Sequence, residues 1–474
     1  MRSSPPPPLQ SSSRSVVIKT QTLRPFIWLG LLLLAGLTRP VLLSQAVPMV
    51  QLSSQTTQPQ ALAGARSQQR QQQERQVRPE NYDLARYPID DRNAKHWKNL
   101  LWTTAIVEPK QPFVAQAMDK ILAMTRQAKL STAQMRTIDM ALQVGTQLYL
   151  ADPNTYSSLA TQFRATIEQS KDPQWVAMAI SVLANPETMA KTNLSPQEIQ
   201  QLSQRIQQRF PNWQNQPYLY TTLQDIATRF NPPNLPPLQE LLQWQAKPGE
   251  MQAYVFCNAD RHALCRMMLK DDRGQWVREK GQLWSVPLLL RSLHGLNWNF
   301  VRGNTPQGLY RIDGTTPQPD DLFFRAYGQF SLVNLFVPLE AGTTAVAGFS
   351  GSPTDYQALL PPSWRNHWGL QQSYWAGKLG RSLFRIHGTG DAPDFFSGKQ
   401  LNPASANWNP TIGCLSALEL YSETGKLLQA DMPQILEKFQ AASSDTLQGY
   451  LVVVEIPTTT GQSIAPEDIM PGIK

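Results

Sequence analysis

One histidine and one cysteine in the last quarter of the chain are of the types that thiol catalysis requires. His387 ends an apolar strand pattern and precedes Gly388, and Cys414 follows Gly413 after a loop rich in Pro, Asn, Ser and Gly. A thiolate can attack a carbonyl carbon while an imidazole takes the proton and later returns it. Gly413 would let backbone N–H groups approach a developing oxyanion. The pair is compatible with a cysteine nucleophile and a histidine base, although a lone Cys is more often a small buried hydrophobe than a nucleophile.

Two motifs in the C-terminal half carry a family likeness. One consists of Ile-His-Gly-Thr at 386–389 and, after a loop, Thr-Ile-Gly-Cys-Leu at 411–415. The other is Asn-Thr-Pro-Gln-Gly-Leu-Tyr-Arg-Ile at 304–312, and an apolar strand pattern at 450–456 follows both. Together they resemble the catalytic domain of the L,D-transpeptidases (the YkuD family), over roughly residues 250–457. The resemblance implies a mostly β sandwich with the Cys and the His at one edge of the sheet.

The resemblance also implies an acyl transfer on peptidoglycan. Cys414 would attack the bond between the third and fourth residues of a stem tetrapeptide, form a thioester and release terminal D-Ala. An amine of a neighbouring stem would then give a cross-link, whereas water would give a trimmed tripeptide. His387 would be the base and acid, with its ring held by the Gly388 carbonyl. Backbone N–H groups around Gly413 and Cys414 would stabilise the oxyanion.

Hydroxyl groups and Gly413 beside this pair are the candidate substrate-binding residues: Thr389, Thr411, Gly413 and Ser416. No metal or organic cofactor is expected. The five His residues show no ligand spacing, and Gly388-Thr389-Gly390 is too little for a phosphate loop.

Three positions depart from the family pattern. Ser416 stands where an Arg is usual, Ile412 where a His or Lys is common, and Glu419 where an Asn is frequent. The missing Arg matters most, because a guanidinium there could anchor a substrate carboxylate and favour the thiolate. The nearby cations that could replace it are Arg381, Arg385 and Lys399.

Three functions therefore stay open: an envelope L,D-transpeptidase, an L,D-carboxypeptidase, and a non-catalytic scaffold that binds peptidoglycan. The retention of both His387 and Cys414 favours an enzyme, since a pure binder has little use for the pair. The loss of the Arg favours the scaffold.

The elements that must position the pair are predicted as strands. Apolar patterns indicate strands over 252–257, 263–269, 284–290, 308–312, 323–335, 383–386 and 450–456, with one helix over 432–441. Cys257 and Cys265 fall on the first two strands and could form a disulfide that leaves Cys414 free, or could both be buried thiols. Residues 340–381 form a long aromatic loop, read either as a cover over the active site or as a surface insertion.

Residues 90–245 are predicted to form a helical bundle or a short solenoid. Apolar residues recur at helical spacing over 93–107, 112–128, 131–148, 153–168, 172–185, 195–209 and 216–230. Ser131, Asp152 and Ser195 supply start signals, the last two directly before a Pro. The region shows no visible chemistry, so its aromatic residues are interpreted as core, with a docking surface for a protein partner or a glycan as the alternative.

The N-terminus predicts export. Residues 1–46 combine basic residues with the apolar run PFIWLGLLLLAGL, as in a signal peptide or an inner-membrane anchor. Residues 47–89 are predicted to be a disordered Gln-rich linker, and 458–474 a C-terminal tail. Residues 1–79 hold nine Lys or Arg and one acidic residue, while the rest is close to neutral, so no nucleic-acid partner is expected. The predicted location is the periplasm or cell envelope.

Overall fold

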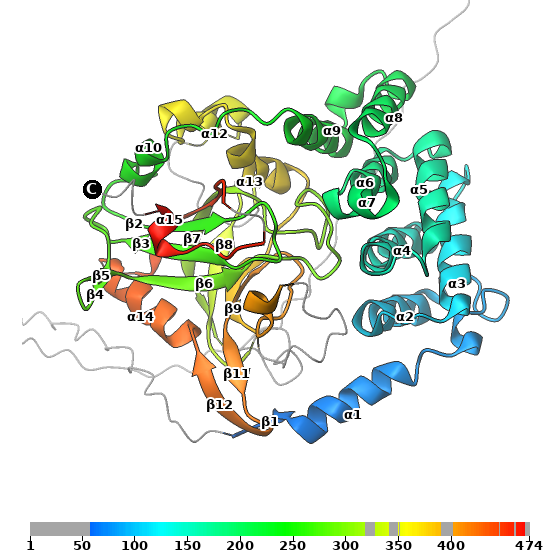
Figure 1. The fold of residues 1–474 in the computed structure, drawn as a ribbon, viewed down its shortest axis with the longest axis horizontal. Coiled ribbons are helices and arrows are strands. Elements are labelled where there is room, and N and C mark those ends of the chain that lie inside the picture. Colours follow the sequence, from blue (N-terminus) through cyan, green and yellow to red (C-terminus); the bar gives the residue numbers. More distant parts are fainter. Residues whose placement is uncertain are drawn as a thin grey trace, which may run out of the picture. The chain divides into compact units, whose positions relative to one another are not determined.

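The chain combines a run of helices with a sheet of eight strands and further helices (Figure 1). The computed structural model describes residues 57–317, 328–340, 349, 351–389, 402–444, 446–458 and 461–469. The predicted export segment 1–46 and Lys399 lie outside them, as do residues 323–327 of one predicted strand. Among the described residues, no helix is long and apolar enough to span a bilayer.

All seven helices predicted between residues 93 and 230 are confirmed, with ends shifted by a few residues. Two short helices, α7 and α10, are additional. The bounds are α2 (Ala94–Val107), α3 (Pro112–Ala123), α4 (Thr132–Ala151), α5 (Ser157–Gln169), α6 (Pro173–Leu183), α7 (Pro186–Thr192), α8 (Pro196–Arg209), α9 (Pro217–Phe230) and α10 (Leu238–Gln243). Single 3₁₀ turns are η1 (Pro79–Tyr82), η2 (Met124–Arg126), η3 (Trp213–Asn215), η4 (Pro362–Trp364) and η6 (Pro403–Ser405).

Side-chain caps explain two helix starts. Ser131 and Gln134 form a capping box at α4, in which each side chain accepts a hydrogen bond from the backbone N–H of the other residue. Ser195 and Glu198 do the same at α8. The predicted start at Asp152 is wrong, because its carboxylate accepts from the N–H of Thr155 in a turn and α5 begins only at Ser157.

The helical core takes in residues from beyond the helices. Trp97 and Trp175 are buried in it, as predicted for core aromatics. Leu296 and Phe300, which lie in the loop after the strand Ser285–Leu289, belong to the same cluster. Next to them, the side chain of Asn299 donates to the hydroxyl groups of two threonines of α9, each at 2.8 Å. The loop after the strand Ser285–Leu289 is therefore part of the helical core.

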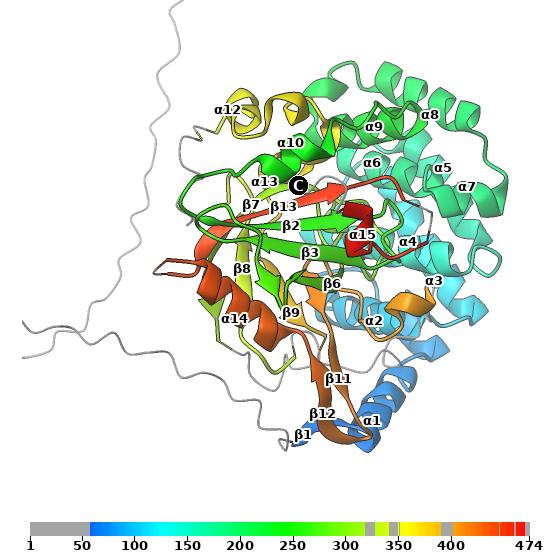
Figure 2. The ribbon, with the colours of Figure 1, turned by 60° about the vertical axis from the view of Figure 1, so that its left-hand side comes forward.

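The prediction of a disordered linker over 47–89 is wrong for residues 57–89. Strand β1 (Thr57–Leu62) pairs antiparallel with β12 (Thr424–Ala430), and α1 (Ala63–Glu74) follows it (Figure 2). Arg70 of α1 donates to the carbonyl of Ile106 at 3.0 Å, and Thr103 donates to Gln73 at 2.6 Å. Strand pairing and polar side-chain bonds thus order a segment that has few apolar residues to bury.

The main sheet closes into a barrel. Its strand order is β10-β6-β3-β2-β13-β7-β8-β9, and all neighbours are antiparallel except the pairs β13–β2 and β10–β9. The resemblance implied a sandwich; the sheet closes instead because the short β10 pairs with both β9 and β6. The bounds are β2 (Met251–Cys257), β3 (Cys265–Lys270), β6 (Ser285–Leu289), β7 (Gly308–Thr316), β8 (Leu332–Phe336), β9 (Phe384–Gly388), β10 (Leu415–Ala417) and β13 (Gln448–Glu455).

Three smaller strands complete the β structure. β4 (Arg278–Glu279) and β5 (Gln282–Leu283) form a short hairpin. β11 (Glu419–Tyr421) joins β12 and β1 in a three-stranded sheet.

Alternate residues of the barrel strands serve two separate cores. Val255, Met267 and Leu451 face inward, where α14 (Met432–Ala442) packs Ile435 and Phe439 against the interior cluster. This helix was predicted over 432–441 and is confirmed. The outer face of β2 and β13 carries a second cluster, covered by α10, α12 (Pro353–Ala358), α13 (Trp368–Lys378) and α15 (Pro466–Ile469).

The stretch 340–381 is not a loop over the candidate site in its described part. It forms α12, η4 and α13, so the prediction of a single helix in this half of the chain is also wrong. Tyr356, Trp364 and Tyr374 are buried against the outer face of β2 and β13. The aromatic residues that suggested a lid are core residues of this second cluster. Residues 341–348 and 350 lie outside the described residues.

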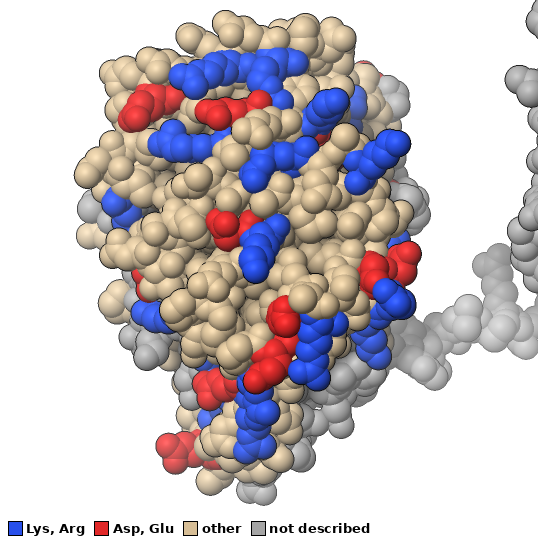
Figure 3. Space-filling view, turned by 90° about the vertical axis from the view of Figure 1, so that its right-hand side faces the viewer, with Lys and Arg blue, Asp and Glu red and all other residues tan. Residues whose placement is uncertain are grey.

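Charges of both signs are dispersed over the helical face. Figure 3 shows Lys and Arg side chains interspersed with Asp and Glu among uncharged residues there. This agrees with the near-neutral balance of the sequence beyond residue 79. Such a mixture of charges is typical of a solvated protein surface.

Candidate active site

Strands β9 and β10 bring the predicted nucleophile and base to the same face of the barrel. β10 begins one residue after Cys414 and runs parallel to β9, with Leu415 opposite Ile386 and Ser416 opposite His387. Ile386 and Leu415 belong to the interior core. Because side chains alternate along a strand, His387 and Ser416 face outward, and Cys414 faces the same way.

Two threonine hydroxyls hold the turn that carries Cys414. Thr411 Oγ1 accepts from the Gly413 N–H at 3.1 Å and donates to the Cys414 carbonyl at 2.8 Å. Thr305 Oγ1 donates to the Gly413 carbonyl at 2.9 Å. The two motifs of the sequence therefore meet at this turn. The hydroxyl of Thr411, predicted to bind substrate, is occupied within the turn itself.

Gly413 is required by the backbone and by a buried arginine. Its φ of +129° is a conformation that side chains rarely adopt, and a Cβ there would overlap Arg381 Nη2. The Arg381 guanidinium is fully enclosed and donates to the carbonyls of Gly303 at 2.9 Å, Asn304 at 2.8 Å and Trp298. Arg381 thus ties the loop after β6 to the floor of the cysteine turn.

The His387 ring is fixed by its own neighbour. Nδ1 donates to the Gly388 carbonyl at 2.7 Å, which confirms the contact expected from the sequence. The carbonyl can only accept, so Nδ1 carries the proton of the neutral ring and Nε2 is the basic nitrogen. The ring is 2% exposed, and this burial lowers the pKa of His387 to about 4. The imidazole is therefore neutral at pH 7.

Glu419 occupies the place where a side chain at Gly388 would lie. A Cβ at 388 would overlap Glu419 Oε2. The carboxylate accepts from the Gln329 N–H at 2.9 Å and from the Tyr421 hydroxyl. Burial raises the pKa of Glu419 to about 7. The glutamate that departs from the family pattern is thus a buried support of the histidine strand.

Thr389 also has a supporting position rather than an open one. Its hydroxyl donates to the Glu419 carbonyl at 2.9 Å and accepts from the Glu419 N–H at 3.2 Å. It is 2% exposed. The hydroxyl thus joins β9 to β11, and its predicted substrate contact stays a prediction.

The Cys414 thiol is buried and protonated. Sγ is directed at the Leu383 carbonyl, 3.8 Å away, and the residue is 8% exposed. Burial raises the pKa of the Cys414 thiol to about 11, and the Arg385 backbone N–H with the Arg385 and Arg381 guanidinium groups offsets this only in part. At neutral pH the site therefore holds a thiol and a neutral imidazole.

The cations proposed to replace the missing Arg have separate positions. Arg381 is engaged by three backbone carbonyls, so it cannot also hold a substrate carboxylate. Arg385 is half-buried, donates to the Phe384 carbonyl at 2.6 Å and acts on the thiol through its charge. Ser416 itself is fully buried beside His387. Its predicted substrate contact stays a prediction.

Exposed apolar side chains border the cysteine turn. Leu383 is 67% exposed and Ile412, two residues before the cysteine, is 43% exposed. Leu383 has a φ of +64°, unusual for a residue with a side chain, and its N–H donates to Glu340 Oε1 at 3.0 Å. Leu339, the residue before Glu340, is also exposed. Exposed apolar side chains thus lie beside the buried thiol.

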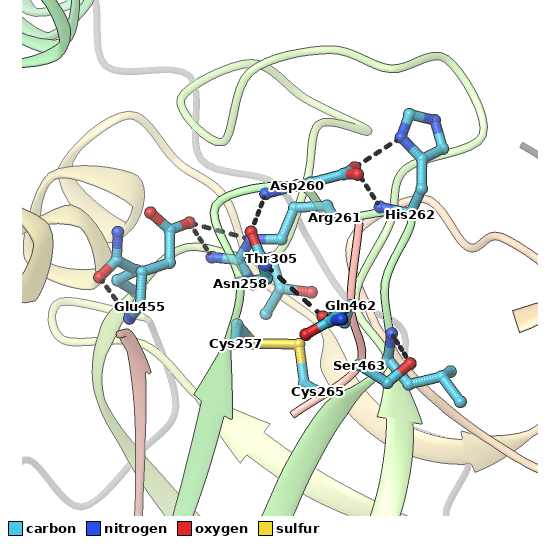
Figure 4. Close-up of a disulfide and its surroundings, with 12 residues drawn as sticks. Cys257, Asn258, Asp260, Arg261, His262, Cys265, Thr305, Glu455, Gln462 and Ser463 are labelled. Atoms are coloured by element: carbon cyan, nitrogen blue, oxygen red, sulfur yellow. Dashed lines mark hydrogen bonds and ion pairs between the residues drawn. A yellow bond between two sulfur atoms is a disulfide. The ribbon is translucent and has the colours of Figure 1, made fainter. Parts of the chain in front are cut away.

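The remaining two cysteines form a disulfide at one end of the barrel (Figure 4). Cys257 of β2 and Cys265 of β3 have Cα atoms 4.3 Å apart, which confirms the pairing predicted as one of two alternatives. Nearby, the buried Arg261 forms an ion pair with the partly exposed Glu455 at 2.7 Å. Cys414 is the free cysteine of the described residues.

Sequence reasoning missed three supports of the site. Thr305 lies in the second motif, which was the available signal, but no role was assigned to its hydroxyl. Glu419 gave no signal of burial, because carboxylates are rarely enclosed. Leu383 gave none either, because its positive φ depends on the turn between α13 and β9.

Comparisons with family models, with curated proteins and with solved structures find no match to this chain. Within the described residues, no cluster of His, Cys, Asp or Glu could hold a metal ion. The fold, the position of the pair and the contacts around it are therefore the basis for any assignment of function.

Proposed function

We propose that the protein is a cell-envelope cysteine acyltransferase of the L,D-transpeptidase type, acting on peptidoglycan stem peptides. One observation carries the proposal. The strand that starts after Cys414 runs parallel to the strand that carries His387, both side chains face the outside of the barrel, and the Gly388 carbonyl fixes the His387 tautomer. The two motifs of the resemblance meet at the same turn through Thr305. In this proposal the barrel is a divergent form of the L,D-transpeptidase catalytic domain.

The first half-reaction would be acylation of Cys414. The neutral His387 would take the thiol proton at Nε2 as sulfur attacks the carbonyl carbon of the third stem residue. The bond to terminal D-Ala would then break, a thioester would form, and the imidazolium would give its proton to the leaving amine. Because Sγ is directed at the Leu383 carbonyl, substrate binding would have to turn the thiol toward the ring.

The second half-reaction would be transfer to an amine. The amino group of a neighbouring stem would attack the thioester and lose a proton to His387, which would return it to the leaving thiolate. The Gly413 N–H is bonded to Thr411, so the Cys414 N–H is our candidate for oxyanion stabilisation in both steps. Replacement of the amine by water would make the same residues an L,D-carboxypeptidase.

Two observations favour the non-catalytic alternative. Burial holds the pKa of the Cys414 thiol at about 11, and Ser416 provides no positive charge where the family has an arginine. A pocket with such a thiol could hold stem peptides without turning them over. The assay below separates the two.

Export to the periplasm or cell envelope is part of the proposal. The basic and apolar segment 1–46 supports it. The Cys257–Cys265 disulfide supports it independently, because disulfides persist mainly in oxidising compartments. Peptidoglycan stem peptides are the proposed substrate, and the helical part is available to a protein partner.

The test is turnover of a disaccharide-tetrapeptide by the full-length protein, followed by mass spectrometry. The expected product is a cross-linked dimer with release of D-Ala, absent in both Cys414→Ala and His387→Ala. Tripeptide without dimer would identify the carboxypeptidase. Absence of any Cys414-dependent product, with amine acceptors of several kinds supplied, would favour the scaffold.

A further inference from the structure

A cleft of about 250 Å³ lies between helix α9 and the helices that cover the barrel, well apart in sequence from the cysteine turn. Helix α9 contributes Tyr220 and Gln224, and α13 contributes Trp368 and Trp375. Figure 1 shows α9 beside α12 and α13. The candidate chemistry at Cys414 and His387 does not use this cleft.

Three aromatic rings give the cleft its apolar surface. The Tyr220 ring centroid lies 4.9 Å from that of Trp375 and 6.0 Å from that of Trp368. All three residues are only partly buried, so their rings reach the surface instead of filling a core. Rings held at such angles offer flat apolar faces of the size of a pyranose ring.

Carboxamides supply the polar part of the lining. Four of them border the cleft, among them Gln224, Gln357 and Gln371. Gln371 donates to the Arg365 carbonyl at 2.6 Å, whereas no side-chain hydrogen bond holds Gln224 or Gln357 within the described residues. A carboxamide both donates and accepts hydrogen bonds, so these two groups can donate to, or accept from, the hydroxyl and acetamido groups of a ligand.

The lining carries no ionisable group other than the Tyr220 phenol. Asp225 follows Gln224 on α9 and is buried. Its carboxylate accepts hydrogen bonds from the side chains of Asn297, Trp298 and Trp368. The Lys378 ammonium lies 5.3 Å from the Trp375 ring centroid, outside the lining. This composition disfavours phosphate and carboxylate ligands, and its carboxamides disfavour a purely apolar one.

We propose that this cleft binds an uncharged, N-acetylated glycan chain, with pyranose faces on the aromatic rings and acetamido groups on Gln224 and Gln357. The inference rests on the proposed function, because the stem peptides of that reaction are attached to such a chain. It adds a sugar site that the resemblance does not contain, built partly from the helices that precede the barrel.

Direct contacts connect the cleft to the cysteine turn. Trp368 lies against Trp298, with ring centroids 6.2 Å apart. The Trp298 carbonyl accepts from Arg381, and the same guanidinium lies against Gly413. The cleft and the floor of the cysteine turn are thus connected through two buried residues, Trp298 and Arg381.

The test is binding of chitohexaose to the full-length Cys414→Ala protein, measured by calorimetry in a non-glycosidic detergent. We expect saturable binding that Gln357→Ala and Tyr220→Ala each weaken about tenfold. Gln207→Ala is the matched control, because Gln207 is half-buried on α8, away from the cleft, and should bind as the parent does. Gln357 is half-buried too, so its truncation leaves a folded protein even if Tyr220→Ala does not.

Three outcomes would overturn the inference. They are no saturable binding at millimolar sugar, binding that survives both cleft substitutions, and equal binding of maltohexaose, which lacks acetamido groups. The parent protein of this assay has no nucleophile, so its result does not depend on turnover. Failure of the proposed function would appear instead in the stem-peptide assay, where Cys414 is intact.

Discussion

The carboxyl group of Glu419 lies directly against the Cα of Gly388, in the space where any side chain at 388 would have to be. The strand that carries His387 therefore ends on a glycine because its neighbour is a buried glutamate. Glu419, which departs from the family pattern, and the retained Gly388 depend on each other, because the glutamate fills the space that a side chain at 388 would need.

Gly388→Ala should destabilise the fold. The added methyl group would overlap Glu419 Oε2, and overpacking of a core typically costs about 1–3 kcal/mol. Urea unfolding measures the change. The double variant Gly388→Ala/Glu419→Ala should recover part of the loss, because it removes the overlapping carboxylate; equal costs of Gly388→Ala with and without Glu419 would contradict the packing described above.

The stability of the protein should fall as pH rises from about 4.5 to 7 because of Glu419. Burial raises its pKa from 4.5 to about 7 in the folded state. Over this range the folded state binds more protons than the unfolded state, so the free energy of unfolding decreases with pH, by an amount on the order of 3 kcal/mol. The contribution is fully present below about pH 4.5 and lost above about pH 7.

Glu419→Gln is the variant that isolates the contribution of Glu419 to the pH dependence of stability. Glutamine keeps an acceptor for the Gln329 N–H but does not ionise. The free energy of unfolding of the parent minus that of the variant, measured from pH 4 to 8, should decrease as the pH rises from about 4.5 to 7. Parallel curves for the two proteins would show that Glu419 keeps its ordinary pKa.

Alkylation of Cys414 by iodoacetamide should be slow at neutral pH and should rise steadily up to about pH 11. The pKa of the thiol is raised to about 11, so its thiolate fraction at pH 7 is roughly 100-fold below that of an ordinary cysteine. Mass spectrometry of the intact protein measures the rate, and Cys414→Ala gives the background. A rate that levels off below pH 8 would indicate an activated thiolate instead.

Thr305→Val should impair the cysteine turn while it keeps the shape of the side chain. The substitution removes the bond to the Gly413 carbonyl and leaves that carbonyl enclosed, at a cost of about 1–2 kcal/mol. Thr305→Ser keeps the hydroxyl and serves as the control. If Cys414 is the nucleophile, product formation should fall about tenfold in the valine variant beyond any loss of folded protein, and equal activity of both variants would argue against a positioning role.

The helices and the barrel strands other than β10 were predictable because their sequence signals are local. Apolar spacing and the caps at Ser131 and Ser195 define helices within a few residues. β10 could not be recognised, since three residues are too few to show an alternation, and the closure of the barrel depends on it. Without that strand, seven predicted strands fit an open sandwich as well as a barrel.

Misread segments share a different cause. α1 has no apolar stripe. The strand before it, β1, pairs with β12, and α1 itself is hydrogen-bonded to α2, contacts that only the folded chain supplies. α13 is rich in aromatic residues and glycine, which suggested a loop, yet its Tyr374 side is core. For the candidate site, the sequence identified His387, Cys414 and the Gly388 contact, whereas the roles of Thr389 and Thr411 depended on hydrogen bonds to distant or backbone groups.

The insertion of Leu296 and Phe300 into the helical core has a consequence for biosynthesis. During translation the helices α2 to α9 are complete by residue 230, but their core still lacks two large side chains. Some seventy further residues, including β2 and β3, must leave the ribosome before that core can close. The packing of the helical core is thus completed only after the first strands of the barrel have been synthesised, so the two halves of the chain mature together.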